Sequence, residues 1–156
     1  MKSYNNGIYL LDAHYLRDNL AAVYMIVEGD SVALVETANA PSLKYVLEAL
    51  SELNLTPEAV KYILLTHIHL DHAGGAGSYM AAFPNAKLVV HPKGVRHMID
   101  PSYLEAGVVG VYGQEFVDKV YGKLAPIDAS RIVNAEDGLT INLNGRQLIC
   151  RDTPGH

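Results

Sequence analysis

The chain of 156 residues has one cysteine, no tryptophan and only two phenylalanines. A single cysteine, Cys150, cannot form an intramolecular disulfide, and its apolar flanks indicate a small buried residue with no redox role. No apolar run approaches the roughly 20 residues that a membrane-spanning helix needs. Residues 1–7 are polar and lack the apolar core of a secretory signal. We therefore expect a cytoplasmic protein without a membrane partner.

Clusters of positive charge are also absent from the sequence. The 12 Lys and Arg residues against 17 Asp and Glu residues give a net charge of -5. The basic residues are scattered, whereas a nucleic-acid-binding protein gathers them into a patch or stripe. Nucleic acid is therefore not an expected partner. A content of 49% hydrophobic and 19% charged residues is typical of an ordinary globular chain.

The spacing of apolar residues alternates between strand and helix patterns, which predicts an α/β fold. Short apolar segments predict strands, the first three forming an antiparallel sheet edge, at residues 8–11, 21–28, 31–37, 62–66 and 87–91. Apolar residues at three-and-four spacing after Pro41 predict a helix packed on one face, and residues 78–83 predict another helix. Asn144-Gly145, between predicted strands at 139–143 and 146–152, is a strong hairpin signal.

From residue 92 to about residue 131 the strand pattern lapses, which indicates a helical insertion interrupted at Pro101, Gly107, Gly110 and Gly113. Two interpretations of its aromatic residues stay open. They form the small core of the insertion, which we favour, or they line a substrate pocket with Tyr103, Tyr112 or Phe116. Three isolated histidines are expected to be surface or capping residues, namely His14, His91 and His97.

Four residues of metal-ligand type follow the strand at 62–66 within six positions: His67, His69, Asp71 and His72. Imidazole nitrogens and carboxylate oxygens are ligands that zinc and iron prefer. His67 and His69 are two residues apart, so in an extended or looped segment they project to the same side. One or two loop histidines would be ordinary surface residues, but this density predicts a metal site at the carboxyl end of the strand.

The segment Thr66-His-Ile-His-Leu-Asp-His72 resembles the HxHxDH signature of the metallo-β-lactamase superfamily. Thr153-Pro-Gly-His156 is similar to the block that holds this family's third metal-binding histidine. Residues 32–37 resemble the family's early strand and turn, although the family more commonly has Asp where this chain has Glu36. The resemblance implies a four-layer αββα sandwich. The chain would form about the first half of it, as a single incomplete domain over residues 1–156.

The resemblance also implies the ligand set. His67, His69 and His156 would bind the first metal, Asp71 and His72 would begin the second site, and Asp71 would also orient the attacking hydroxide. Two zinc ions would fill the complete site, with iron or manganese as alternatives. Because the family takes its remaining ligands from beyond this point, we expect the sequence to continue after residue 156. An isolated first half would expose an apolar face that favours self-association.

The function implied by the resemblance is metal-dependent hydrolysis of a small-molecule thioester, or of a related ester or lactone, as in hydroxyacylglutathione hydrolases (glyoxalase II). The same superfamily includes persulfide dioxygenases that use a single iron, and this alternative stays open. A third alternative is a truncated fragment without activity, since Asp71 and His72 alone are too few ligands for tight binding at the second site.

Overall fold

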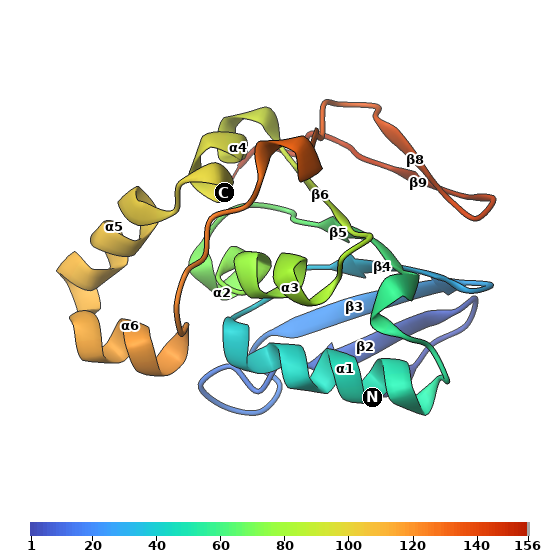
Figure 1. Ribbon diagram of the computed structural model, residues 1–156, viewed down its shortest axis with the longest axis horizontal. Helices are drawn as coiled ribbons and strands as arrows, with labels where there is room; N and C mark the ends of the chain where they lie inside the picture. Colours follow the sequence, from blue (N-terminus) through green and yellow to red (C-terminus); the bar gives the residue numbers. More distant parts are fainter. Residues whose placement is uncertain (156) are drawn as a thin grey trace.

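The computed structural model describes residues 1–155 and contains one seven-stranded sheet and one two-stranded sheet (Figure 1). The large sheet has its strands in sequence order: β1 (Lys2–Ser3), β2 (Ile8–Asp12), β3 (Ala22–Glu28), β4 (Ser31–Val35), β5 (Val60–Leu64), β6 (Lys87–Val90) and β7 (Ile132–Asn134). Pairing is antiparallel from β1 to β4 and parallel from β4 to β7. The predicted α/β class and the antiparallel edge are confirmed.

Two helices, α1 (Leu43–Glu52) and α3 (Ala76–Ala82), lie over the sheet (Figure 1). A common core joins them to the strands. The helices contribute Val46, Leu50 and Tyr79 to this core, which also contains Met25 from β3 and Ile63 from β5. Each fully buried side chain of this size contributes about 1.5–3 kcal/mol relative to an exposed one. The strand that precedes the ligand motif is therefore fixed within the main core.

Three helices follow β6, namely α4 (Pro92–Ile99), α5 (Ser102–Tyr112) and α6 (Gln114–Val120). The last two run out to the left in Figure 1, and we call residues 102–120 the arm. The chain then returns to the sheet as β7, after a short 3-10 helix, Ala129–Arg131. The Arg131 guanidinium fixes this return by donating to the backbone oxygens of Met80, Phe83 and Ala86 at 2.7–3.2 Å.

The predicted hairpin forms the small sheet, β8 (Thr140–Leu143) and β9 (Arg146–Ile149). Its turn residues Asn144 and Gly145 both have positive φ, at 49° and 100°, as such a two-residue turn requires. Cys150 follows β9 and is half-buried, whereas the sequence analysis placed it inside the core. The reason is that β9 pairs only with β8 in the described residues, so few neighbours cover this end.

Several predicted boundaries were wrong. The strand expected at 31–37 ends at Val35, because Glu36 has a φ of 70° that no strand can contain. The strand predicted at 146–152 ends at Ile149, and β7 lies directly after the insertion, where the sequence analysis predicted no strand. Gly107 and Gly110 do not interrupt α5, since a glycine inside a helix costs only about 1 kcal/mol. The helix does end at Gly113, which has a φ of 84°.

Short 3-10 helices precede α1, at Ala40–Ser42, and β5, at Pro57–Ala59. Each contains a proline at its first or second position, where the missing N–H is not needed. Among residues 1–155, no helix has both the length and the apolar composition needed to cross a membrane.

Candidate metal centre

The ligand motif lies where β5 leaves the parallel part of the sheet. The strand ends at Leu64, the chain passes through His67 and His69, and α2 (Leu70–Ala73) begins at once. The segment with His67 and His69 is a loop, as the sequence analysis expected, and the second half of the motif is helical. Asp71 and His72 lie in the short helix α2. This position at the carboxyl ends of parallel strands is where α/β sheets form their binding crevices.

The rings of His69 and His72 both lie close to the ring of His67. The ring centroids of His67 and His69 are 4.9 Å apart with the rings nearly perpendicular, and those of His67 and His72 are 4.0 Å apart. Imidazoles this close, contributed by one short segment, form a dense group of nitrogen atoms of the kind that bind metals. The structure thus brings together residues that the sequence analysis assigned to two neighbouring metal positions.

Asp71 and His72 also present ligand atoms side by side. The Oδ2 atom of Asp71 lies 3.4 Å from the Nε2 atom of His72. Two ligand atoms each about 2.1 Å from a tetrahedral ion are roughly 3.4 Å apart, so this pair fits a shared metal ion. Both side chains are partly exposed, which leaves the position accessible from solution.

Glu36 holds the other side of the His72 ring. Its Oε2 atom lies 3.2 Å from Nδ1 of His72, and its Oε1 atom accepts a hydrogen bond of 3.0 Å from the Thr66 amide. A proton on Nδ1 that is donated to this carboxylate leaves the Nε2 lone pair available for a metal. Carboxylates that orient ligating histidines in this way are a general feature of metal sites.

Burial determines the electrostatics of Glu36. The residue is only 7% exposed. This burial raises the pKa of its carboxyl group above the ordinary value, and the hydrogen bonds from Thr66 and the charge and hydrogen bond of His72 offset only part of that increase. The sequence analysis gave Glu36 no firm role because the family more commonly has Asp here. The signal that could have found it is its position in the family's early block, directly after a buried strand.

A buried polar network fixes the loop that follows Glu36. The amide and the hydroxyl of Thr37 both donate to the backbone oxygen of His72, at 2.8 and 2.9 Å. Ser42 Oγ lies 2.7 Å from the hydroxyl of Tyr79, and Asn39 Nδ2 donates to the Val120 oxygen at 2.6 Å. Burial raises the pKa of Tyr79, so its hydroxyl stays neutral. The network attaches the ligand helix α2 to α3 and α6.

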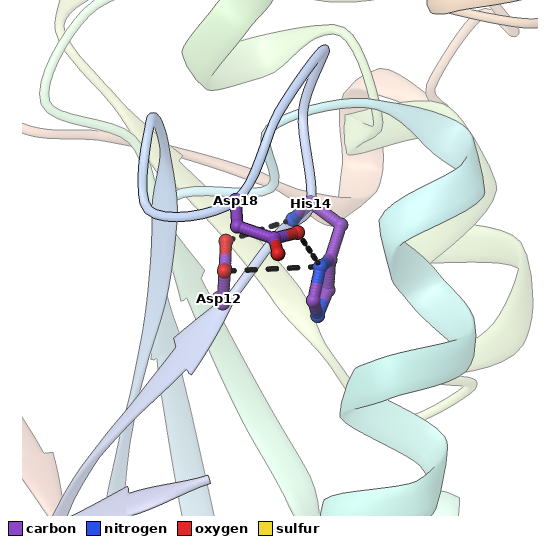
Figure 2. A group of neighbouring side chains, drawn as sticks. All are labelled: Asp12, His14 and Asp18. Atoms are coloured by element: carbon purple, nitrogen blue, oxygen red, sulfur yellow. Dashed lines mark hydrogen bonds and ion pairs between the residues drawn. The ribbon is translucent and has the colours of Figure 1, made fainter.

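A second group of ligand-type residues lies in the loop between β2 and β3. Asp12, His14 and Asp18 place one ligand atom each within 4.8 Å of one another (Figure 2). His14 Nδ1 lies 2.7 Å from Asp18, and both oxygens of Asp12 accept backbone amides, from His14 and Asn19 at 2.9 Å. These bonds close the loop. Burial acts to raise the pKa of Asp12, but the two amides and the charge of His14 together lower it.

The remaining predicted histidines have simpler positions. His91 caps α4, its Nδ1 accepting from the Lys93 amide at 3.2 Å, as expected of a capping residue. The ring centroid of His97 lies 5.9 Å from that of Tyr103, and its Nε2 atom accepts a hydrogen bond of 3.1 Å from Arg96 Nε. His156, the expected third ligand of the first metal, lies outside the described residues. The assignment of metal ligands to individual residues therefore stays a prediction.

The sequence model of the metallo-beta-lactamase superfamily matches residues 16–156. The chain belongs to this superfamily. A curated relative, hydroxyacylglutathione hydrolase from Serratia proteamaculans, is 36% identical over 112 residues, which are 71% of this chain and 30% of the relative.

Metallo-β-lactamases of known structure share the fold. MEM-A1, a subclass B3 enzyme from a soil metagenome library, aligns with a TM-score of 0.71 and 22% identity over 99% of this chain and 53% of its own. FEZ-1 from Legionella gormanii aligns with a TM-score of 0.71 and 20% identity over 97% of this chain and 52% of its own. This chain therefore spans about half the length of these superfamily members, and the predicted αββα half is confirmed.

Proposed function

We propose that this chain provides the metal-binding part of a hydrolase that cleaves a small-molecule thioester or a related ester or lactone. The observation that carries the proposal is the pair formed by Asp71 and His72, with ligand atoms 3.4 Å apart and with the far nitrogen of His72 held by Glu36. Membership of a superfamily of hydrolases supports the reaction class. The similarity to hydroxyacylglutathione hydrolase favours thioesters among the substrates.

The residues divide into two ligand groups. His67, His69 and His156 would hold a first zinc ion, and Asp71 and His72 would begin the site of a second. When bound by these residues, zinc would lower the pKa of bound water and withdraw electrons from the substrate carbonyl. The Asp71 carboxylate would accept a hydrogen bond from the attacking oxygen and orient it. Glu36 keeps the His72 ring in the orientation and tautomer that ligation requires.

The test measures metal content and thioester hydrolysis together, on the full gene product purified without chelator. We expect two zinc ions per chain in the wild type. His69→Ala should lose first-site metal and thioester hydrolysis, whereas the matched control His97→Ala should keep both. A single iron with oxygen-dependent consumption of a persulfide would overturn the hydrolase in favour of the dioxygenase. A full-length protein that binds no metal would overturn both.

A further inference from the structure

The Glu36 carboxylate is connected to two histidines that the proposed function assigns to different metal positions. Its Oε2 atom lies 3.2 Å from Nδ1 of His72. Its connection to His67 passes through Thr66. The Thr66 hydroxyl oxygen lies 2.9 Å from Nδ1 of His67, and the same hydroxyl also hydrogen-bonds to the Glu36 carboxyl group. One carboxylate therefore reaches both rings, directly on one side and through a hydroxyl on the other.

The backbone holds this carboxylate in one place. The register of β4 and β5 pairs Val35 with Leu64, and the Glu36 amide donates to the Leu64 oxygen at 2.9 Å. Glu36 has a φ of 70°, a left-handed conformation that a residue with a side chain keeps only where its surroundings fix it. Its burial and the hydrogen bond of 3.0 Å from the Thr66 amide to Oε1 provide that constraint.

A count of protons gives the direction of each hydrogen bond. An ionised carboxylate can only accept, and a threonine hydroxyl has one proton to donate. Because the Thr66 hydroxyl donates that proton to Glu36, its oxygen accepts from His67. The proton of the neutral His67 ring is then on Nδ1 and the lone pair is on Nε2. His72 has the same tautomer, because its Nδ1 atom also faces the carboxylate.

The tautomer decides which nitrogen of a histidine can bind a metal ion. A neutral imidazole binds through the nitrogen that has no proton, and the hydrogen bond made by the other nitrogen selects it. The ring centroids of His67 and His72 are only 4.0 Å apart. A single buried group between the two chain segments can therefore determine the metal-binding nitrogen of both rings.

We propose that Thr66 is a positioning residue that transmits the orienting effect of Glu36 to His67, so that one carboxylate serves a ligand of each metal position. This inference rests on the proposed function, which assigns His67 and His72 as ligands. The hydroxyl of Thr66 is essential for this role and its methyl group is not. Serine should therefore replace threonine, and valine should not. If Thr66 only packed through its methyl group, the order would be the opposite.

The first measurement locates the His67 proton in the full gene product, freed of metal with a chelator. Nitrogen-15 NMR of the imidazole rings at about pH 8, where an unperturbed imidazole is neutral, distinguishes the two tautomers. The His67 signals are identified by their loss in His67→Gln. We expect the proton on Nδ1 in the wild type and in Thr66→Ser, and a loss of this preference in Thr66→Val.

The second measurement is zinc affinity, by competition with a chromogenic chelator. Thr66→Val should bind the first zinc ion about 10-fold more weakly than the wild type, as is usual when a group that orients a ligand is removed. Thr66→Ser should stay within about 2-fold. The matched control Thr140→Val, at an exposed position of β8, should equal the wild type in both measurements.

The possible results separate this inference from the proposed function. A His67 proton on Nε2 in the wild type would overturn the inference, even if Thr66→Val failed to fold. Equal zinc affinities of folded Thr66→Val and wild type, or equal losses in Thr66→Val and Thr66→Ser, would also overturn it. Wild-type protein with the Nδ1 proton and bound zinc but no thioester hydrolysis would support the inference and overturn the proposed function. Thermal unfolding checks that each variant is folded.

Discussion

The ligand segment and the arm differ in how tightly the rest of the chain holds them. Around α2, Gly75 and Gly77 pass so close to neighbouring backbone that an added Cβ would lie 2.7 and 2.2 Å from carbonyl oxygens. In the arm, none of the α5 residues Ser102–Tyr112 is buried, and a Cβ at Gly107 or Gly110 would meet nothing within 4 Å. Residues that would bind a metal ion need positions held within fractions of an ångström, whereas exposed segments can vary.

The largest effect should follow from changing the reacting carboxylate. Asp71→Asn is expected to lower thioester turnover about 10²–10⁴-fold, since an amide cannot accept a proton or neutralise a cation. First-site zinc, held by the histidines, should remain. The matched change on the arm, Asp118→Asn, should leave turnover within about 2-fold. Equal activity of Asp71→Asn and wild type, measured at saturating zinc, would refute the role of Asp71.

Glu36→Gln should have the next largest effect. The amide can still accept from the Thr66 amide but does not provide the negative charge that orients His72, so zinc affinity is expected to fall about 10–100-fold. Competition with a chromogenic chelator measures this affinity. Glu115→Gln, exposed in α6, provides the matched control. Unchanged zinc affinity in Glu36→Gln would mean that the carboxylate only supports the loop backbone.

Glycine-to-alanine changes test the packing difference directly. Gly77→Ala should destabilise the protein by about 1–3 kcal/mol, because its Cβ would collide with the Ala125 backbone. Gly107→Ala in the open arm should instead stabilise it by up to about 1 kcal/mol, as alanine favours the helix. Denaturant unfolding gives both values. If both substitutions changed the free energy of unfolding by similar amounts in the same direction, the inferred difference in packing between α3 and the arm would be wrong.

The smallest effect concerns the β2–β3 loop and pH. The pKa of Asp12 is lowered below its ordinary value of 3.8, so the carboxylate stabilises the folded loop at higher pH. That contribution is lost as the pH falls below 3.8 through the folded pKa. The protection factors of the His14 and Asn19 amides against hydrogen exchange, which correct for the intrinsic rate at each pH, should therefore fall in this range. Asp12→Asn should show low protection factors at all pH values, and wild-type protection factors that do not depend on pH would exclude the carboxylate as the cause.

The ligand motif could be predicted because its information is local. His67, His69, Asp71 and His72 follow one recognisable apolar strand, and any fold that forms this strand brings them together. The role of Glu36 could not be predicted in this way. It depends on the parallel register of β4 and β5, in which Val35 pairs with Leu64 and so places Glu36 beside Thr66.

The contact between Tyr15 and Tyr121 is even less accessible from the sequence. Their hydroxyl oxygens are 2.7 Å apart, although the two residues are separated by 106 positions. The helical spacing of Phe116, Val117, Val120 and Tyr121 indicates a shared helix face, but it does not indicate that Tyr15 packs against it. The continuous helix α5 was missed for a different reason. Glycines were expected to interrupt it, but their cost is small compared with the hydrogen bonds that a continuous helix retains.

The strand order of the large sheet has a consequence for how the metal centre forms. Each strand from β2 to β7 pairs with the one before it in the chain, and among residues 1–155 no later strand inserts between earlier ones. During synthesis, which proceeds from the amino terminus, the sheet can extend one strand at a time. The strand before the ligand motif gains its partner β4 as soon as it emerges. The segment from His67 to His72 can therefore reach its place before β6 and β7 have been synthesised.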